Sequence, residues 1–139
     1  MKIEEFQGTY RWLSNFWPVP IVYDGITYES TEVAYQAAKT NNRKVREIFA
    51  KLTAAESKTL GQNIIIRPDW DAVKLDVMEE VLRYKFSNSE MRRKLIATGD
   101  AELIEGNNWN DTFWGVCKGV GQNHLGKLIM KIRDEINGK

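Results

Sequence analysis

Residues 29–39 read ESTEVAYQAAK and contain the clearest helix start in the chain. Ser and Thr are favoured N-cap residues because their hydroxyl oxygen accepts a hydrogen bond from a backbone N–H of the first turn. We therefore expect a helix that is capped by Ser30 or Thr31 and runs through Lys39. The preceding residues 21–28 read IVYDGITY, and the Asp-Gly between two strand-like runs predicts a type I′ hairpin that leads into this helix.

The expected helix carries different chemistry on its two sides. At about 100° per residue, Glu32, Gln36 and Lys39 point the same way, with Tyr35 beside them. The alanines among residues 34–38 lie on the opposite side, where small side chains allow close approach to a core. A second interpretation is that the side with Glu32, Gln36 and Lys39 is exposed to solvent. In that case Glu and Lys only stabilise the helix, by roughly a few tenths of a kcal/mol.

Hydrophobic spacing and capping patterns predict the other elements. Helices are expected over residues 44–52, from Thr53 to Gly61, along a core face from Val73 to Phe86 that Asp69 or Asp71 caps, from Ser87 to Leu95 with Gly99 as C-cap, and over residues 123–136. Short strands are expected within residues 2–7, 64–66 and 101–105. Residues 9–16 and 106–121 show no period, so we expect ordered loops there. The second is of a length that is usually functional or disordered, and its aromatic residues argue against disorder.

Length and composition favour one domain that spans residues 1–139. A chain of 139 residues can bury a hydrophobic core without disulfides or metals. Several helices combined with a short β-hairpin and small β elements predict a helix-rich α+β fold. The 20 Lys and Arg residues nearly balance the 19 Asp and Glu residues, so the net charge of +1 provides no general attraction to nucleic acid or anionic membranes.

The sequence also narrows the chemistry and the compartment. Cys117 is the only cysteine, which excludes an intramolecular disulfide, and with His124 as the only histidine a Cys/His zinc site is excluded too. We therefore expect neither a metal nor a cofactor, and catalysis by Asp, Glu, Lys, Tyr, Ser, Thr or amide groups. There is no apolar signal core and no run of about 20 apolar residues, so we expect a cytoplasmic protein without a membrane partner. The oligomeric state is left open.

Seven short segments, in order along the chain, resemble one protein family. These are WLSNF at 12–16, STE at 30–32, YQAAK at 35–39, RPDW at 67–70, KF at 85–86, TGD at 98–100 and WG at 114–115, followed by Leu125-Gly126, Met130 and Arg133. Together they resemble the YbiA-like or NADAR family through nearly the whole chain. The sequence departs from the usual family pattern at Val33, often His, and at Thr40, often aromatic. These changes flank the expected site and affect the substrate more than the chemistry.

The resemblance implies an enzyme that cleaves an N-glycosidic bond. Some members of the family hydrolyse phosphorylated ribosylamino-pyrimidine intermediates of riboflavin synthesis, and others remove ADP-ribose from modified guanine. By position, Glu32, Trp70 and Asp111 resemble the family's active-site residues. Lys39 resembles a lysine that is proposed to form a Schiff base with the opened sugar.

The chemistry of such a bond suits two carboxylates. Cleavage at the anomeric carbon develops positive charge on the sugar and negative charge on the departing nitrogen. We expect Glu32 to be the acid and base, because a hydrophobic setting raises the pKa of a carboxyl group. Asp111 lies among three asparagines and is expected to stay ionised and to position ribose hydroxyls or water. Its alternative is an Asx-turn or loop cap.

Lys39 has two functional interpretations. As an ammonium ion it would bind a phosphate or stabilise negative charge. As a free amine it would attack the open-chain aldehyde of a ribosylamine, provided that burial or a neighbouring cation lowers its pKa. We favour covalent catalysis on the resemblance alone.

Further residues are expected to contact the substrate. Trp70, Trp109 and Trp114 offer rings for stacking on a base, although packing in the core is an equally ordinary use of Trp. Arg67 and Arg11 are candidates for a phosphate because a guanidinium group matches its geometry. The other expected contacts are Asn15, Phe16, Tyr35, Gln36 and Lys85. For Asn15 and Lys85 the alternatives are an ordered-loop amide and a surface lysine.

Three functions are compatible with these residues. The first is a metal-independent N-glycosidase that acts on a small phosphorylated ribosylamine. The second is removal of ADP-ribose from guanine, with nucleic acid as a partner only in its ADP-ribosylated form. The third is a catalytically silent module that binds a nucleotide sugar, which would tolerate loss of Glu32 or Lys39.

Overall fold

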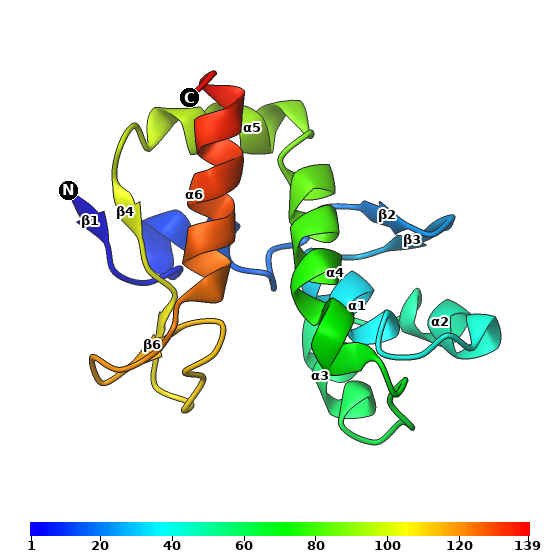
Figure 1. Cartoon of the computed structure of the whole chain (residues 1–139). Helices are drawn as coiled ribbons and strands as arrows, with labels where there is room; N and C mark the ends of the chain where they lie inside the picture. Colours follow the sequence, from blue (N-terminus) through cyan, green and yellow to red (C-terminus); the bar gives the residue numbers. More distant parts are fainter. The chain divides into compact units, whose positions relative to one another are not determined.

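The computed structural model describes all 139 residues and contains six α-helices, a 3₁₀ helix and three two-stranded β-pairings (Figure 1). The helix-rich α+β class predicted from the sequence is confirmed. The chain divides into two compact units, a middle unit of residues 15–85 and a terminal unit of residues 1–14 and 86–139. The single domain that we expect for residues 1–139 stays a prediction. No helix combines the length and the apolar character needed to cross a membrane.

The middle unit begins with the predicted hairpin. Strands β2 (Ile21–Tyr23) and β3 (Ile26–Tyr28) are antiparallel, with the first residue of β2 opposite the last residue of β3. Asp24 and Gly25 join them with φ angles of 48° and 81°, both positive as a type I′ turn requires. The helices that follow are α1 (Thr31–Ala37), α2 (Arg43–Phe49), α3 (Ala54–Gly61) and α4 (Trp70–Lys85).

Helix α1 is the centre of this unit. Ser30 is its N-cap, because its hydroxyl accepts a hydrogen bond from the Val33 N–H at 3.3 Å. The helix ends at Ala37, two residues before the predicted end at Lys39. All seven of its residues are buried, since α2, α3, α4 and both strands of the hairpin pack against it. The interpretation that the side of the helix with Glu32 and Gln36 is exposed to solvent is therefore wrong.

The later elements of the middle unit confirm one local pattern and contradict another. Thr53 caps α3 with the predicted capping box, in which the Glu56 side chain accepts a hydrogen bond from the Thr53 N–H at 2.9 Å. The buried strand predicted at residues 64–66 is wrong. No strand forms there, and Ile65 is 94% exposed. A strand needs a hydrogen-bonding neighbour, and these residues have none.

The terminal unit pairs segments that are distant in sequence. Strand β1 (Lys2–Ile3) is parallel to β4 (Glu102–Leu103), with Ile3 opposite Leu103, and β5 (Gly106–Asn107) is parallel to β6 (Val116–Cys117). Strands β1 and β4 are shorter than the strands predicted within residues 2–7 and 101–105. The 3₁₀ helix η1 (Gly8–Leu13) occupies most of the loop expected at residues 9–16. The unit's α-helices are α5 (Ser89–Ala97) and α6 (His124–Ile136).

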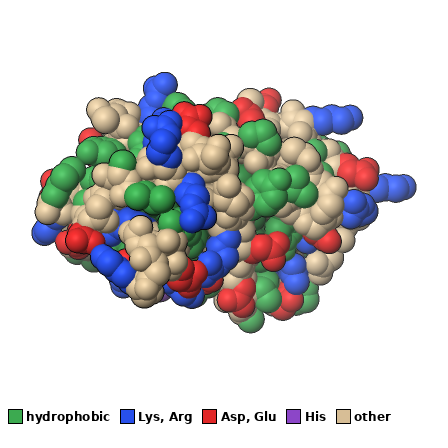
Figure 2. All heavy atoms as spheres, turned by 90° about the horizontal axis from the view of Figure 1, so that it is seen from above, with side chains coloured by type: hydrophobic (Ala, Val, Ile, Leu, Met, Phe, Trp, Pro, Cys, Tyr) green, Lys and Arg blue, Asp and Glu red, His purple; other side chains and the backbone are tan.

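Asn123 connects α6 to β4. It adopts a left-handed backbone with φ of 53°, donates from Nδ2 to the Leu103 carbonyl at 2.9 Å and accepts from the Glu105 N–H at 3.0 Å. Gly126 lies against the same carbonyl, and a Cβ there would overlap the Leu103 oxygen. The segments before and after the loop of residues 106–121 are therefore held together by these contacts. On the face drawn in Figure 2, cationic and anionic side chains are interspersed, in line with the balanced charge.

Candidate active site

Glu32 and Gln36 form a buried pair on one side of α1. Their side chains are 9% and 5% exposed, and the Gln36 Nε2 donates to the Glu32 Oε2 at 2.7 Å. The spacing of four residues places them on neighbouring turns, as the sequence predicted. Hydrogen bonds to charged groups are shorter and stronger than neutral ones, so this contact fixes the carboxylate.

Lys39 lies just beyond the end of α1. Its main chain is fixed at both ends, because its N–H donates to the Gln36 carbonyl at 3.2 Å and its carbonyl accepts from the Arg67 N–H at 2.7 Å. Its Nζ lies 5.9 Å from the centre of the Tyr35 ring, within the range of a cation–π contact. The Tyr35 ring in turn lies 5.0 Å from that of Trp70, with the planes tilted by 58°. Trp70 is buried, so the structure places it in the aromatic packing around α1.

Burial and three charged groups act on the pKa of Lys39. Burial lowers the pKa of Lys39, the charge of Glu32 opposes this effect, and the charges of Lys58 and Lys74 lower the pKa further. A lowered pKa was the condition for a nucleophilic lysine. Lys58 belongs to α3 and Lys74 to α4, so lysines from two other elements act on the pKa of Lys39.

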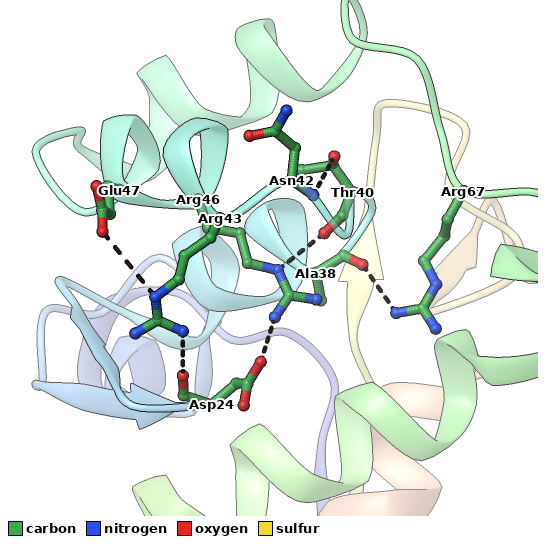
Figure 3. A network of polar contacts seen from close by, with 8 residues as sticks. All are labelled: Asp24, Ala38, Thr40, Asn42, Arg43, Arg46, Glu47 and Arg67. Carbon is green, nitrogen blue, oxygen red and sulfur yellow. Dashed lines mark hydrogen bonds and ion pairs between the residues drawn. The ribbon is translucent and has the colours of Figure 1, made fainter.

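A second polar network holds the segment that follows α1 (Figure 3). Arg46 of α2 is buried, donates from Nε to the Thr40 carbonyl at 2.8 Å and pairs through Nη1 with the Asp24 carboxylate at 2.9 Å. Arg67 approaches the same segment from the other side and donates to the Ala38 carbonyl at 3.5 Å. The residues on either side of Lys39 are therefore bound to two arginines.

Arg67 already has a carboxylate partner. Its Nε and Nη2 contact the two oxygens of Asp69 at 2.6 and 2.9 Å. This bidentate pair raises the pKa of Arg67 and lowers that of Asp69. The role of Arg67 in binding a phosphate stays a prediction. Arg11, the second candidate for the phosphate, is an exposed residue of η1 in the terminal unit.

Asn15 and Lys85 have buried positions in the middle unit. The Asn15 carbonyl accepts from the Glu32 N–H at 3.1 Å, and its Oδ1 accepts from the Thr31 hydroxyl at 2.7 Å, so Asn15 holds the first turn of α1. Lys85, the last residue of α4, is fully buried, and burial lowers its pKa to about 7. Phe16, by contrast, is 42% exposed.

Asp111, Trp109 and Trp114 lie in the terminal unit. The Asp111 Oδ1 accepts from the N–H groups of Phe113 and Trp114 at 3.1 and 2.9 Å, which is the geometry of an Asx-turn. Asn107 supports the same turn by donating from Nδ2 to the Asp111 carbonyl at 2.9 Å. Trp114 packs edge-on against Phe113, with ring centres 4.9 Å apart, while Trp109 is 48% exposed.

The candidate residues thus form two groups, each within its own unit. The group around α1 contains Glu32, Tyr35, Gln36, Lys39 and Trp70. The loop group contains Asp111 with the two tryptophans. That Glu32 and Asp111 serve one site stays a prediction.

Three positions of this region had no signal in the sequence. Lys58 and Lys74 are ordinary helical lysines until α3 and α4 are packed on α1. Arg46 reads as a polar position of an amphipathic helix, whereas the fold buries it. No group of three or more His, Cys, Asp or Glu side chains is arranged to hold a metal ion.

Residues 3–137 match the family model of the NADAR domain. The chain belongs to the NADAR family. It is 37% identical over 128 residues to N-glycosidase YbiA of Shigella boydii, a match that covers 88% of this chain and 79% of the relative. It is also 37% identical over 135 residues to an N-glycosidase of Nostoc punctiforme, with 91% and 86% of the two chains covered.

Two further comparisons extend the NADAR assignment. A riboflavin biosynthesis protein of Vibrio vulnificus is 35% identical over 129 residues, which cover 89% of this chain and 35% of that protein. The NMR structure of the Escherichia coli protein YbiA matches the structure with a TM-score of 0.85 at 33% identity, covering 99% of this chain and 84% of that one. The family predicted from the seven short segments is confirmed.

Proposed function

We propose that this NADAR protein is an N-glycosidase that hydrolyses the C–N bond of a phosphorylated ribosylamine. The observation that carries the proposal is the buried carboxylate of Glu32, hydrogen-bonded to Gln36 on α1, beside a lysine whose pKa is lowered. Similarity to proteins named N-glycosidase supports the reaction. Similarity to a riboflavin biosynthesis protein supports a ribosylamino-pyrimidine as the substrate class.

The residues around α1 support a covalent route. The ribosylamine opens to an imine between C1′ and the exocyclic nitrogen, and the neutral Nζ of Lys39 attacks C1′. Glu32 accepts the two Nζ protons one after the other and passes each to the departing nitrogen, so that the C1′–N bond breaks, the base leaves as its free amine and a neutral Lys39 imine remains. Water then adds to this imine, releasing ribose phosphate and the free amine of Lys39.

Other residues have supporting roles in the proposal. Asp111 positions a ribose hydroxyl or the water, and its carboxylate retains one oxygen beyond the Oδ1 that accepts the two backbone hydrogen bonds. The exposed ring of Trp109 stacks on the base. Lys58 and Lys74 supply positive charge near Lys39 for the phosphate.

Incubation with defined substrates tests the proposal. The full chain is mixed with a phosphorylated ribosylamino-pyrimidine or with an ADP-ribosylated guanine oligonucleotide, and products are resolved by mass spectrometry. Release of the free pyrimidine and ribose phosphate is the expected result. Release of ADP-ribose alone would show that the substrate is ADP-ribosylated guanine and not a ribosylamine. Tight binding without products would contradict the proposal that the protein is an enzyme.

A further inference from the structure

The two ends of the Gln36 amide have different surroundings. Its Nε2 donates to the Glu32 Oε2 at 2.7 Å, whereas its Oε1 is buried without a hydrogen-bond partner. A buried acceptor that makes no hydrogen bond is unfavourable, so a compensating interaction must hold the side chain in place. The charge-assisted bond to Glu32 is that interaction.

Gly61, in the last turn of α3, makes room for this amide. A Cβ at Gly61 would overlap the Gln36 Oε1 and lie 2.9 Å from its Cδ, but it would lie 3.6 Å from its Cβ, an ordinary contact. The amide therefore occupies the space that any larger residue at Gly61 would need. No group of the protein donates a hydrogen bond to the Oε1.

The orientation of the amide depends on the proton of Glu32. With a carboxylate at Glu32, the Nε2 faces it as a donor. If the amide turned over, its Oε1 would face the carboxylate oxygen, and two acceptors would meet unless Glu32 carried a proton. The orientation with the Nε2 toward Glu32 therefore stabilises an ionised Glu32 more than a neutral one.

We propose that Gln36 is a positioning residue that holds Glu32 as a carboxylate before the substrate binds, and that Gly61 keeps Gln36 in place. This deepens the proposed function and rests on it for its catalytic meaning. A carboxylate at rest starts the cycle by accepting the Lys39 proton and then serves as the acid. Gln36, which the sequence suggested as a substrate contact, acts through Glu32 instead.

Other titratable and charged groups lie on the elements around α1. The charge of Glu32 raises the pKa of Lys39, and the charges of Lys58 on α3 and Lys74 on α4 lower it. Arg46 of α2 is bound to the Thr40 carbonyl and to Asp24 of the hairpin. Lys85 of α4 is fully buried, and the pKa of each of the two hairpin tyrosines, Tyr23 and Tyr28, is raised mainly by burial. All of these groups are unchanged by substitutions at Gln36 or Gly61.

A direct titration of Glu32 tests the proposal without requiring turnover. The carboxyl carbons of labelled glutamate are followed by NMR against pH in the full chain, with Glu32→Gln used to assign the signal. Gln36→Met keeps the volume and removes the donor, and we expect the proton affinity of Glu32 to rise about tenfold. Gln62→Met, the same change at the exposed residue that follows α3, should leave it unchanged. An unchanged or lower proton affinity in Gln36→Met would overturn the proposal.

A double variant tests the role of Gly61. Gly61→Ala should displace the amide and raise the proton affinity of Glu32 much as Gln36→Met does. In a Gln36→Ala background the added methyl group meets only an ordinary contact, so Gly61→Ala should then have no further effect. Equal effects of Gly61→Ala in both backgrounds would remove Gly61 from the proposal. If Glu32 titrates as expected but no substrate is cleaved, the proposed function fails and the role of Gln36 stands.

Discussion

Glu32 and Asp111 are the two carboxylates of the proposed reaction, and the molecule holds them in different ways. Glu32 belongs to a helix that is buried on every side, and a neighbouring side chain binds it. Asp111 belongs to a loop and binds the backbone N–H groups of Phe113 and Trp114. The first is fixed by packing and the second by its own turn.

This difference has a consequence for mutation. A conservative change at Glu32 alters the charge of a site whose shape the surrounding helices maintain. A change at Asp111 alters the charge and removes the acceptor that orders the loop. One substitution at Glu32 can therefore separate a catalytic effect from a structural one, whereas two substitutions are needed at Asp111.

The largest effect is expected from Glu32→Gln. The amide keeps the shape of Glu32 but cannot accept and return a proton, so kcat should fall at least about a hundredfold, a typical acid and base contribution. Urea unfolding should show a free energy of unfolding close to that of the unchanged protein. A near-normal kcat in this variant would show that Glu32 is not the acid and base, and Glu32 and Asp111 would then not be two carboxylates of one reaction.

Asp111 is expected to show an intermediate effect that depends on the replacement. Asp111→Asn keeps an oxygen for the two backbone N–H groups and loses the charge, so kcat/KM should fall about tenfold with little change in stability. Asp111→Ala should lose, in addition, about 1 kcal/mol of unfolding free energy, as for a lost cap. If Asp111→Asn retains full activity and only Asp111→Ala is impaired, Asp111 is a loop cap alone.

Several features of the fold were predictable because they are local. Ser30 as the cap of α1, the Thr53 capping box and the Asp24-Gly25 turn each depend on residues within a few positions. The cap of α5 was misplaced by one residue, since Asn88 rather than Ser87 accepts from the first-turn N–H groups. Both residue types suit the cap, and only the geometry distinguishes them.

The remaining features depend on contacts between distant segments. The pattern at residues 64–66 is typical of a strand, but no neighbouring strand is available to pair with it. Helix α1 appears two-sided in sequence because its alanines contrast with Glu32 and Gln36. The fold buries both sides, since α2, α3, α4 and the hairpin pack around this short helix. The buried position of Arg46 likewise arises only when α2 meets the segment after α1.

Arg46 offers a smaller test of how packing holds the α1 region. Arg46→Met should remove the bond to the Thr40 carbonyl and the Asp24 pair, lowering the free energy of unfolding by about 1–2 kcal/mol. Arg43→Met is the matched control, because Arg43 also contacts Asp24 but is exposed and should cost less than about 0.5 kcal/mol. Equal losses in urea unfolding would show that burial of Arg46 does not matter.

The smallest expected effect concerns the charge next to Lys39. The rate should rise with pH as Lys39 loses its proton, and the lowered pKa moves this rise toward lower pH. Lys58→Met removes one of the charges that lower the pKa, so the rise should move to higher pH and the rate at neutral pH should fall roughly twofold to fivefold. Lys44→Met, exposed on α2, serves as control. A profile that stays in place, or moves to lower pH, would contradict the effect.

The central claim is that Lys39, beside the carboxylate of Glu32, bonds to the sugar during turnover. Borohydride added to the full chain with a cleaved substrate reduces an imine to a stable amine, which peptide mass spectrometry locates. We predict a sugar phosphate adduct on the Lys39 peptide, absent from Lys39→Met. Turnover of the unchanged protein without any adduct, or an adduct that persists in Lys39→Met, would contradict the account.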